Sequence, residues 1–498
     1  MRRRHFIQSA GWFALAAPVG SFAAKKSKKK GRADPYGHIR MKAGGLATSL
    51  EIFSLYQKQA PVRIEMLKQA YAVLEADPQA SFADLLSHSP FQALCAEAGL
   101  SLLGGPMLGN ISETGASVWV RTLRPAQVSV RVGGQTLGPV ASSATTDLTA
   151  VVAVSGLKPG TENRYQILID GNPVASIGAQ CIRTVPEQHP NSRIAFGSCW
   201  HRWGLGHAHL DTIRARKPLA MLMIGDVAVQ DRLGHAGLQR HDVLLRDLRP
   251  RWQNFASEMP VYVTWDDHDY AANDVSGVMK KFSAEDRQRT LQVFRESWVN
   301  PEYGNGSEGL FLHRRIGPAD VIMLDNRYFR DHAKGRDSFL GKEQMAWLKE
   351  KLLACTAPFI ILSCGTMFSD YVSGGKDSWG KYDPEGREEL FRFIEEHKIA
   401  GVLMISGDRH GARGFTIPRS GGFKFYEFEG ACCGGRGGLA ATDPAWETQL
   451  YGISYKYAFS EFEFNTTVAD PTVTFRLLDE NETEIYTTKL TRSQLTPG

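Results

Sequence analysis

The chain has 498 residues, of which 43% are hydrophobic and 22% are charged, as in an ordinary soluble globular protein. Its net charge of +5 includes nine Lys and Arg residues within positions 1–32, where no acid occurs, so the remainder of the chain carries −4. A mildly acidic body excludes the basic surface expected of a nucleic-acid-binding protein. The seven cysteines show no CxxC spacing, so neither a zinc knuckle nor a thioredoxin-like pair is predicted.

Positions 1–24 are predicted to be a twin-arginine signal peptide. Arg3 and Arg4 precede an apolar stretch at 11–19, and residues 21–23 supply a small-x-small cleavage site. The apolar stretch is too short for a stable membrane span, although an ordinary Sec signal or an uncleaved anchor are alternatives. The expected partner is the twin-arginine export machinery, and the expected location is periplasmic or secreted. Because this pathway carries folded proteins, it suits a protein that acquires metal before export.

Two segments without clustered ionisable residues follow. Residues 35–103 show helical periodicity at 49–59 and 62–75, which predicts a helical N-terminal segment packed on the main body. Residues 104–186 contain short strands, separated by Gly-containing turns, at 117–121, 127–132, 149–154 and 164–169. This spacing predicts an immunoglobulin/fibronectin-like β-sandwich with a structural role.

Residues 190–498 alternate between apolar strands and helical stretches, which predicts a layered α/β sandwich domain. The predicted strands lie at 193–196, 219–224, 261–264, 320–324, 359–362 and 401–405. The predicted helices lie at 234–255, 284–299, 342–354 and 384–397.

Polar residues recur where these strands end. The motifs are Gly-Ser-Cys at 197–199, Gly-Asp at 225–226, Trp-Asp-Asp-His-Asp at 265–269, Leu-Asp-Asn-Arg at 324–327 and Ser-Gly-Asp-Arg-His at 406–410. Each alone has an ordinary explanation, such as a turn, a helix cap or a small buried cysteine. Together they are expected at one sheet edge, where ligands of α/β sheets bind. Acids gathered there would repel one another unless cations neutralised them, and oxygen donors with a few nitrogens favour Ca, Mn, Fe or Zn.

In this order, together with Asn273-Asp274 and Tyr328, the motifs resemble those of the alkaline phosphatase D (PhoD-like) metallophosphoesterases over about residues 104–480. The resemblance implies a metal-dependent phosphoric ester hydrolase, acting as a phosphodiesterase or phosphomonoesterase on a small-molecule substrate. It also implies a set of metal ligands: Cys199, Asp226, Asp267, Asn273, Asp408 and His410, with Asn273 the weakest candidate. The implied cofactors are divalent or trivalent ions, calcium together with iron or another transition metal.

One position departs from the family pattern. The family has an iron-binding tyrosine three residues after the Gly-Asp aspartate, where this chain has Val229, which cannot coordinate a metal. Asp231 keeps its place in the pattern, with an ordinary turn residue as the alternative interpretation. A calcium-containing or otherwise substituted cluster therefore stays open alongside an iron site.

The expected mechanism is attack of a metal-bound hydroxide on the phosphorus, with Asp226 bridging two cations. His268 is expected to protonate the leaving oxygen or to bond the phosphate, and Asp269 to orient the imidazole of His268.

Three residues are candidates for the substrate site. Arg327 offers a planar fork for phosphate oxygens, the alternative being an ion pair with Asp325. Lys281 is a second possible phosphate contact. Trp379, in a Gly-rich loop at 373–380, is a candidate for a substrate wall, unless this segment is a plain surface loop.

Two other functions stay open, and a third is not supported by the sequence. A different phosphoester specificity, for nucleotide or phospholipid diesters, is an alternative within the same chemistry. A catalytically silent, metal-stabilised exported binding protein is an alternative of another class, and the valine at position 229 keeps it open. A serine hydrolase is not supported, because no Gly-x-Ser-x-Gly elbow follows a strand.

Overall fold

The computed structural model describes residues 44–304, 306, 308–330, 338–370, 378–440, 442 and 447–498. The predicted signal peptide at 1–24 and most of the Gly-rich loop lie outside these residues. None of the helices in the described ranges combines the length and the apolar character that crossing a membrane requires.

The described part of the predicted helical segment forms α1 (Leu46–Ser54), α2 (Pro61–Ala76), α3 (Phe82–Ser87) and α4 (Ser89–Glu97). Ser81 begins α3 with a capping box, because its hydroxyl accepts the N–H of Asp84 while the Asp84 carboxylate accepts the N–H of Ser81. Leu67 of α2 shares a hydrophobic core with Leu244 of α7 (Ala236–Asp247). These helices therefore pack on the body of the protein, and the assignment of a separate helical segment at 35–103 stays a prediction.

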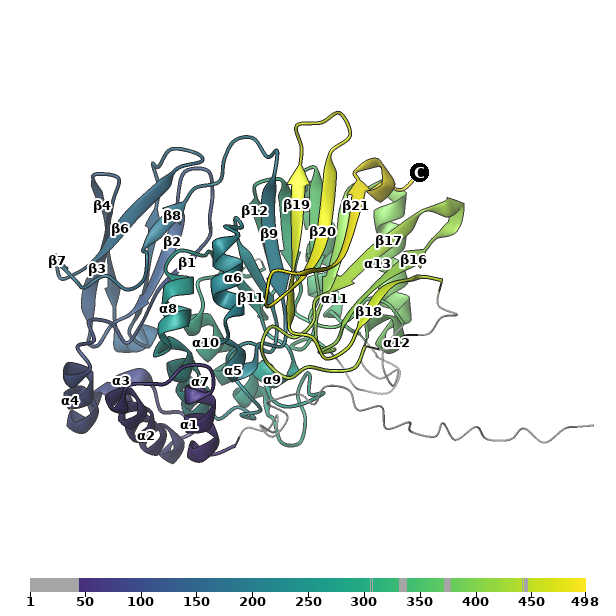
Figure 1. Cartoon of the computed structure of the whole chain (residues 1–498). Helices are drawn as coiled ribbons and strands as arrows, with labels where there is room; N and C mark the ends of the chain where they lie inside the picture. Colours follow the sequence, from purple (N-terminus) through teal and green to yellow (C-terminus); the bar gives the residue numbers. More distant parts are fainter. Residues whose placement is uncertain are drawn as a thin grey trace, which may run out of the picture. The chain divides into compact units, whose positions relative to one another are not determined.

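Two small antiparallel sheets follow (Figure 1). The first has the order β1-β2-β5, with bounds Gly104–Gly109, Ala116–Arg121 and Thr149–Val154. The second has the order β4-β3-β6-β7, with bounds Gln135–Ser142, Ala126–Val132, Glu162–Ile169 and Asn172–Pro173, and β8 (Cys181–Arg183) pairs with β6. Val118 and Val152 of the first sheet share a core with Val130 and Ile167 of the second. All four predicted strands are present, and the immunoglobulin/fibronectin assignment stays a prediction.

Two larger sheets form the rest of the body. The six-stranded sheet has the order β11-β10-β9-β19-β20-β21, with bounds Val261–Thr264, Met221–Ile224, Ser192–Gly197, Ala458–Asn465, Thr472–Asp479 and Glu484–Thr491. The seven-stranded sheet has the order β12-β13-β14-β15-β17-β16-β18, with bounds Leu312–Ile316, Ala319–Met323, Phe359–Ser363, Val402–Ser406, Lys424–Glu429, Ala412–Pro418 and Gln449–Ile453.

Strand β10 shows how the layers are built. Successive side chains of a strand point to opposite faces of its sheet. Leu222 and Ile224 share a core with residues of the second sheet, such as Leu403 of β15. Met221 and Met223 instead pack with helices α6 (His209–Ala215), α8 (Pro250–Ala256) and α10 (Ala284–Ser297). On the second sheet, α11 (Gly341–Ala354) and α13 (Pro384–Glu396) cover the outer face (Figure 1). The result is a layered α/β sandwich of two sheets between helices.

Two sequence predictions need correction. The helix predicted at 234–255 is two helices, α7 and α8, because Pro250 stands at the first turn of α8 and Arg249 before it is extended. The six predicted strands do not share one sheet, since β9, β10 and β11 belong to the six-stranded sheet and β13, β14 and β15 to the seven-stranded one. The edge expected to carry the polar motifs is therefore formed by two sheets.

A fully buried ion-pair cluster ties α7 to the segment that follows β10. The carboxylate of Asp242 accepts from Arg202 at 2.9 Å and from Arg232 at 2.7 and 2.8 Å. Burial opposes the charge of Asp242, but the two guanidinium groups outweigh it and hold the pKa of Asp242 below its ordinary value. Because the folded-state pKa is depressed, this stabilisation is present at neutral pH and is lost only as the solution becomes strongly acidic.

Replacing Asp242 by asparagine is expected to lower the free energy of unfolding by about 3–5 kcal/mol, since it leaves two buried guanidinium groups short of their partner. Urea denaturation at neutral pH measures this loss. Lys68→Ala is the control, because it breaks an exposed pair with Glu65 and should cost less than about 0.5 kcal/mol. Equal effects of the two substitutions would contradict the role given to Asp242.

Candidate metal centre

Five of the predicted ligands come together where strands of both sheets end. Cys199 follows β9, Asp226 follows β10 and Asp267 follows β11, while Asp408 and His410 follow β15. The turn after β15 packs tightly against the end of β10. A Cβ on Gly407 would lie only 2.8 Å from the carbonyl oxygen of Ile224, so glycine is needed there. Gly407 therefore lets the end of β15 meet the end of β10.

One side of the cluster is rich in oxygen. Carboxylate oxygens of Asp226, Asp266, Asp267 and Asp408 all lie within 4.8 Å of one another. Asp266 was not predicted as a ligand from the sequence, although it belongs to the Trp-Asp-Asp-His-Asp motif. Four acids at this spacing are the arrangement that hard cations bind.

The other side of the cluster offers sulfur and nitrogen. The thiol of Cys199 and one ring nitrogen each of His201 and His410 lie within 4.8 Å of one another. The two imidazole rings stack with their centroids 5.3 Å apart. His201 was missed by the sequence analysis because it belongs to none of the recognised motifs. Its spacing of two residues from Cys199 was the one signal that pointed to it.

Several donor atoms of the cluster are buried without a hydrogen bond. Both carboxylate oxygens of Asp226, Nε2 of His201 and Nδ1 of His410 have no hydrogen-bond partner within the described residues. Burying such atoms is unfavourable unless another group satisfies them. Since all four atoms are of the kinds that bind metals, the residues present fit a cation cluster.

The electrostatics of the carboxylates lead to the same conclusion. Burial, together with the neighbouring Asp267 and Asp266, raises the pKa of Asp226 well above its ordinary value, against the opposing effect of His268. Burial also raises the pKa of Asp267. Protonation or a bound cation would relieve the repulsion, and a cation allows the carboxylates to stay ionised at neutral pH.

The backbone at the cluster is strained. Cys199, Asp226, Asp408 and His410 have φ angles of 54°, 53°, 75° and 59°, in the left-handed region that residues other than glycine rarely adopt. Such conformations cost free energy, and they persist at sites where the surroundings fix the side-chain directions.

His268 has a different partner from the one predicted. Its Nδ1 lies 2.6 Å from Oδ1 of Asp231, and the amide nitrogen of Gln230 lies 2.9 Å away. Asp269 points elsewhere and accepts backbone N–H groups of residues 227–229 at 2.9–3.2 Å. Consecutive residues at a helix start project in different directions, so Asp269 fixes the loop after β10 while Asp231 orients the imidazole.

The charge of His268 follows from these neighbours. Burial opposes protonation, but Asp226, Asp267 and Asp231 outweigh it and raise the pKa of His268 to about 11. In contrast, burial and the nearby His268 lower the pKa of His410 to about 3. The neighbouring acids therefore favour the protonated form of His268, whereas burial favours the neutral form of His410, which is the form that binds metals.

Arg327 is fully buried and pairs with an acid other than Asp325. Its Nε donates to Oδ1 of Asp266 at 2.6 Å, and the side chain of Asn326 donates to the same oxygen at 2.8 Å. Asp325 is occupied by Nε1 of Trp265 at 2.8 Å and by the backbone N–H of Arg327 at 2.9 Å. The guanidinium group therefore holds Asp266 in place, and a direct contact with phosphate stays a prediction.

The other predicted residues lie in varied surroundings. Asn273 is exposed and its amide donates to Asp274 at 2.8 Å. Lys281 is also exposed. Trp379 is fully buried and stacks on Phe339 with a centroid separation of 5.0 Å, so here the indole is part of a core, and its place in a substrate wall stays a prediction.

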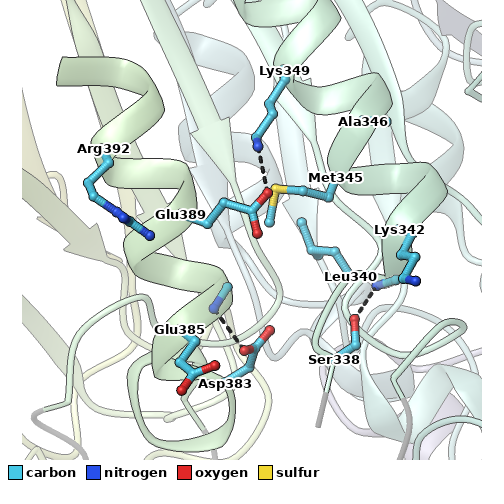
Figure 2. A pocket seen from close by; sticks show the side chains of 12 residues that line it. Ser338, Leu340, Lys342, Met345, Ala346, Lys349, Asp383, Glu385, Glu389 and Arg392 are labelled. Carbon is cyan, nitrogen blue, oxygen red and sulfur yellow. Dashed lines mark hydrogen bonds and ion pairs between the residues drawn. The ribbon is translucent and has the colours of Figure 1, made fainter. Parts of the chain in front are cut away.

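A separate pocket lies between α11 and α13 (Figure 2). It has a volume of about 570 Å³, and none of the predicted ligands lines it. Lys349 pairs with Glu389 across it at 2.5 Å, and Asp383 accepts the N–H of Gly386 at 2.9 Å (Figure 2). Because charges of both signs line this pocket, it lacks the positive surplus that a phosphate site needs.

Two sheets lie between helices, and acids gather where their strands end. Residues 239–459 match the sequence profile of the PhoD-like phosphatases, and the resemblance found in the sequence is confirmed. The chain thus contains a PhoD-like phosphatase region, and this match supports a phosphoesterase. Residues 99–184, which include the two small sheets, match a family described as Domain of unknown function (DUF7800).

One solved structure has a similar fold. "Structure of PhoD" superposes with a TM-score of 0.61 at 19% identity and covers 78% of this chain and 88% of that chain. "GAP50 the anchor in the inner membrane complex of Plasmodium" superposes with a TM-score of 0.38 at 15% identity, covering 61% of this chain and 89% of that chain. No curated protein matches the chain.

Proposed function

We propose that the chain is an exported, metal-dependent phosphoesterase that hydrolyses small-molecule phosphate esters at the cluster of Asp226, Asp267 and Asp408. The observation that supports this most is the buried carboxylate of Asp226, whose two oxygens lie beside other acids and have no hydrogen bond to any described residue. A carboxylate in these surroundings is suited to bridge two cations. Export rests on the twin-arginine pattern of the sequence.

The proposed ligands fall into two sets. Asp226, Asp266, Asp267 and Asp408 would hold a hard ion such as calcium. Cys199 and His410 would hold iron or another transition ion beside it. Cations bound there would lower the pKa of a water molecule and place positive charge next to the phosphate oxygens.

The protein groups around the cluster have separable tasks. With Nδ1 of His268 held by Asp231, the remaining nitrogen, Nε2, is the one that can donate a proton to the leaving oxygen or bond the phosphate. Arg327 keeps Asp266 directed by its bond at 2.6 Å. Asp269 fixes the loop that follows Asp226, because its carboxylate accepts the backbone N–H groups of residues 227–229.

Removing the metal ions is expected to abolish turnover. Protein dialysed against a strong chelator should lose hydrolysis of both p-nitrophenyl phosphate and bis(p-nitrophenyl) phosphate, since no other group in the site can activate water. Adding back calcium together with a transition ion should restore the rate, and the ratio of the two substrates gives the preference for monoester or diester.

Circular dichroism of the chelated protein is the control for unfolding. Full turnover by folded protein without measurable metal would refute the proposal. Wild-type protein that holds its metals but hydrolyses neither ester would favour the catalytically silent binding protein.

A further inference from the structure

His201 is a buried histidine whose position is fixed by the cluster itself. It begins α5 (His201–Gly204), two residues after Cys199, and its φ of 45° is in the left-handed region. Its backbone N–H donates to the carbonyl oxygen of Asp226 at 2.6 Å. The turn after β9 is therefore tied to the turn after β10, and the imidazole of His201 is directed into the space between them.

A hydrogen bond on the far side of the ring determines which nitrogen is available. Nδ1 of His201 lies 2.9 Å from the carbonyl oxygen of the Gln230 side chain, so the proton is assigned to Nδ1. The backbone N–H of Gln230 is in turn bonded to the buried carboxylate of Asp242. A metal-binding histidine typically donates one ring N–H to a carbonyl or carboxylate, so that the lone pair of its other nitrogen can bind the metal.

The imidazole of His201 lies close to two other donor groups. Nε2 of His201 is fully buried and makes no hydrogen bond within the described ranges, and the same is true of Nδ1 of His410. One ring nitrogen of each histidine and Sγ of Cys199 lie within 4.8 Å of one another. Ligands of a tetrahedral zinc ion are separated by roughly 3.3–3.6 Å, so small side-chain movements bring these three atoms to that spacing.

We propose that Cys199, His201 and His410, completed by Asp226, form a tetrahedral site for a divalent transition ion, with zinc as the preferred class. This proposal rests on the proposed function, because it assigns the second half of the same centre. One thiolate, two imidazoles and one carboxylate favour borderline ions and disfavour calcium and magnesium. Val229 packs in the core with α7 and has no donor atom. His201, in the turn after β9, supplies instead the nitrogen that completes the transition-ion half of the centre.

The site predicts two chemically different ions side by side. Asp226 is the shared ligand in this arrangement, because both of its carboxylate oxygens are buried without a hydrogen bond to any described residue. The oxygen-rich half retains Asp266, Asp267 and Asp408 for a hard ion. Loss of His201 should therefore remove the transition ion and leave the hard ion bound.

The test uses the full protein, stripped of metal and reloaded with cobalt(II) in the presence of calcium. Wild-type protein is expected to show the visible bands of tetrahedral cobalt and a thiolate-to-cobalt charge-transfer band. His201→Asn keeps an amide that can bond Gln230 but has no donor at the Nε2 position. It should weaken zinc binding at least about a hundredfold and lose the tetrahedral bands, while calcium content stays unchanged.

Three further variants make the result specific. Cys199→Ser should remove the charge-transfer band, and Gln230→Leu should weaken zinc binding about 10–100-fold through the loss of orientation alone. His189→Asn is the matched control and should leave the spectrum unchanged. His189 is a buried histidine that precedes β9 and is bonded to Ser192.

An unchanged spectrum and zinc stoichiometry in His201→Asn would overturn the assignment of His201, even if wild-type protein hydrolyses phosphate esters. Loss of the bands in His201→Asn, combined with a wild-type protein that hydrolyses no ester, would support the ligand set and overturn only the proposed function. The two failures are therefore distinguishable.

Discussion

Replacing Asp226 by asparagine is expected to lower kcat/KM for an aryl phosphate ester at least about a thousandfold and to reduce bound metal in both halves of the centre. The reason is that Asp226 lies beside the other acids and its charge acts on the thiol of Cys199, and an amide cannot bridge two cations. Steady-state kinetics and elemental analysis of the same preparation measure both effects.

Glu461→Gln provides the control for this experiment. Glu461 is a fully buried carboxylate in β19 that pairs with Arg216 at 2.6 Å, and it lies outside the cluster. Its replacement should lower stability but leave metal content and turnover of the folded protein unchanged. Normal turnover in Asp226→Asn would refute the assignment of the site.

Replacing His268 by glutamine is expected to lower kcat about 10²–10⁴-fold while leaving the metal content nearly unchanged. The imidazole is held by Asp231 through Nδ1, and its proposed role is to act on the substrate with Nε2. Asp231→Asn should give a smaller loss, because it removes only the orientation of the ring. A double-mutant cycle of the two residues should show strong coupling.

Elemental analysis decides whether this role is correct. One nitrogen of His268 lies within 4.8 Å of carboxylate oxygens of Asp226 and Asp267, so a role as a ligand is geometrically possible. Loss of metal in His268→Gln would show that His268 is a ligand and would contradict its role as the acid.

Much of the candidate site could be predicted from the sequence, because the relevant residues directly follow apolar strands. Asp226, Asp267 and Asp408 each stand two or three residues after a strand, and ligands of α/β sheets bind beyond strand ends. Each of these motifs is visible in the sequence without knowledge of the fold. The recognition of the family rested on the same motifs.

The parts that could not be predicted depend on contacts between distant segments. The choice of Asp231 over Asp269 as the partner of His268 depends on how the loop after β10 folds against α9 (Asp267–Tyr270). The pairing of Arg327 with Asp266 joins residues 61 positions apart. No sequence pattern specifies such pairs, and the division of the strands between two sheets was missed for the same reason.

The role of His201 as a candidate ligand could not be predicted from the sequence either. A histidine two residues after a cysteine carries no motif, and its φ of 45° is set by the turn in which it lies. The bond that His201 donates to Gln230 and the proximity of Cys199 and His410 make it a candidate ligand.

Anomalous diffraction from crystals of protein purified from its native compartment tests most directly whether Asp226, Asp267 and Asp408 hold cations. Two peaks are expected, each within about 2.0–2.6 Å of its ligand atoms, with Asp226 as their shared ligand. One should be bound by Asp267 and Asp408 and the other by Cys199 and His410. Crystals of active protein with no metal peak at Asp226, Asp267 and Asp408 would contradict this expectation.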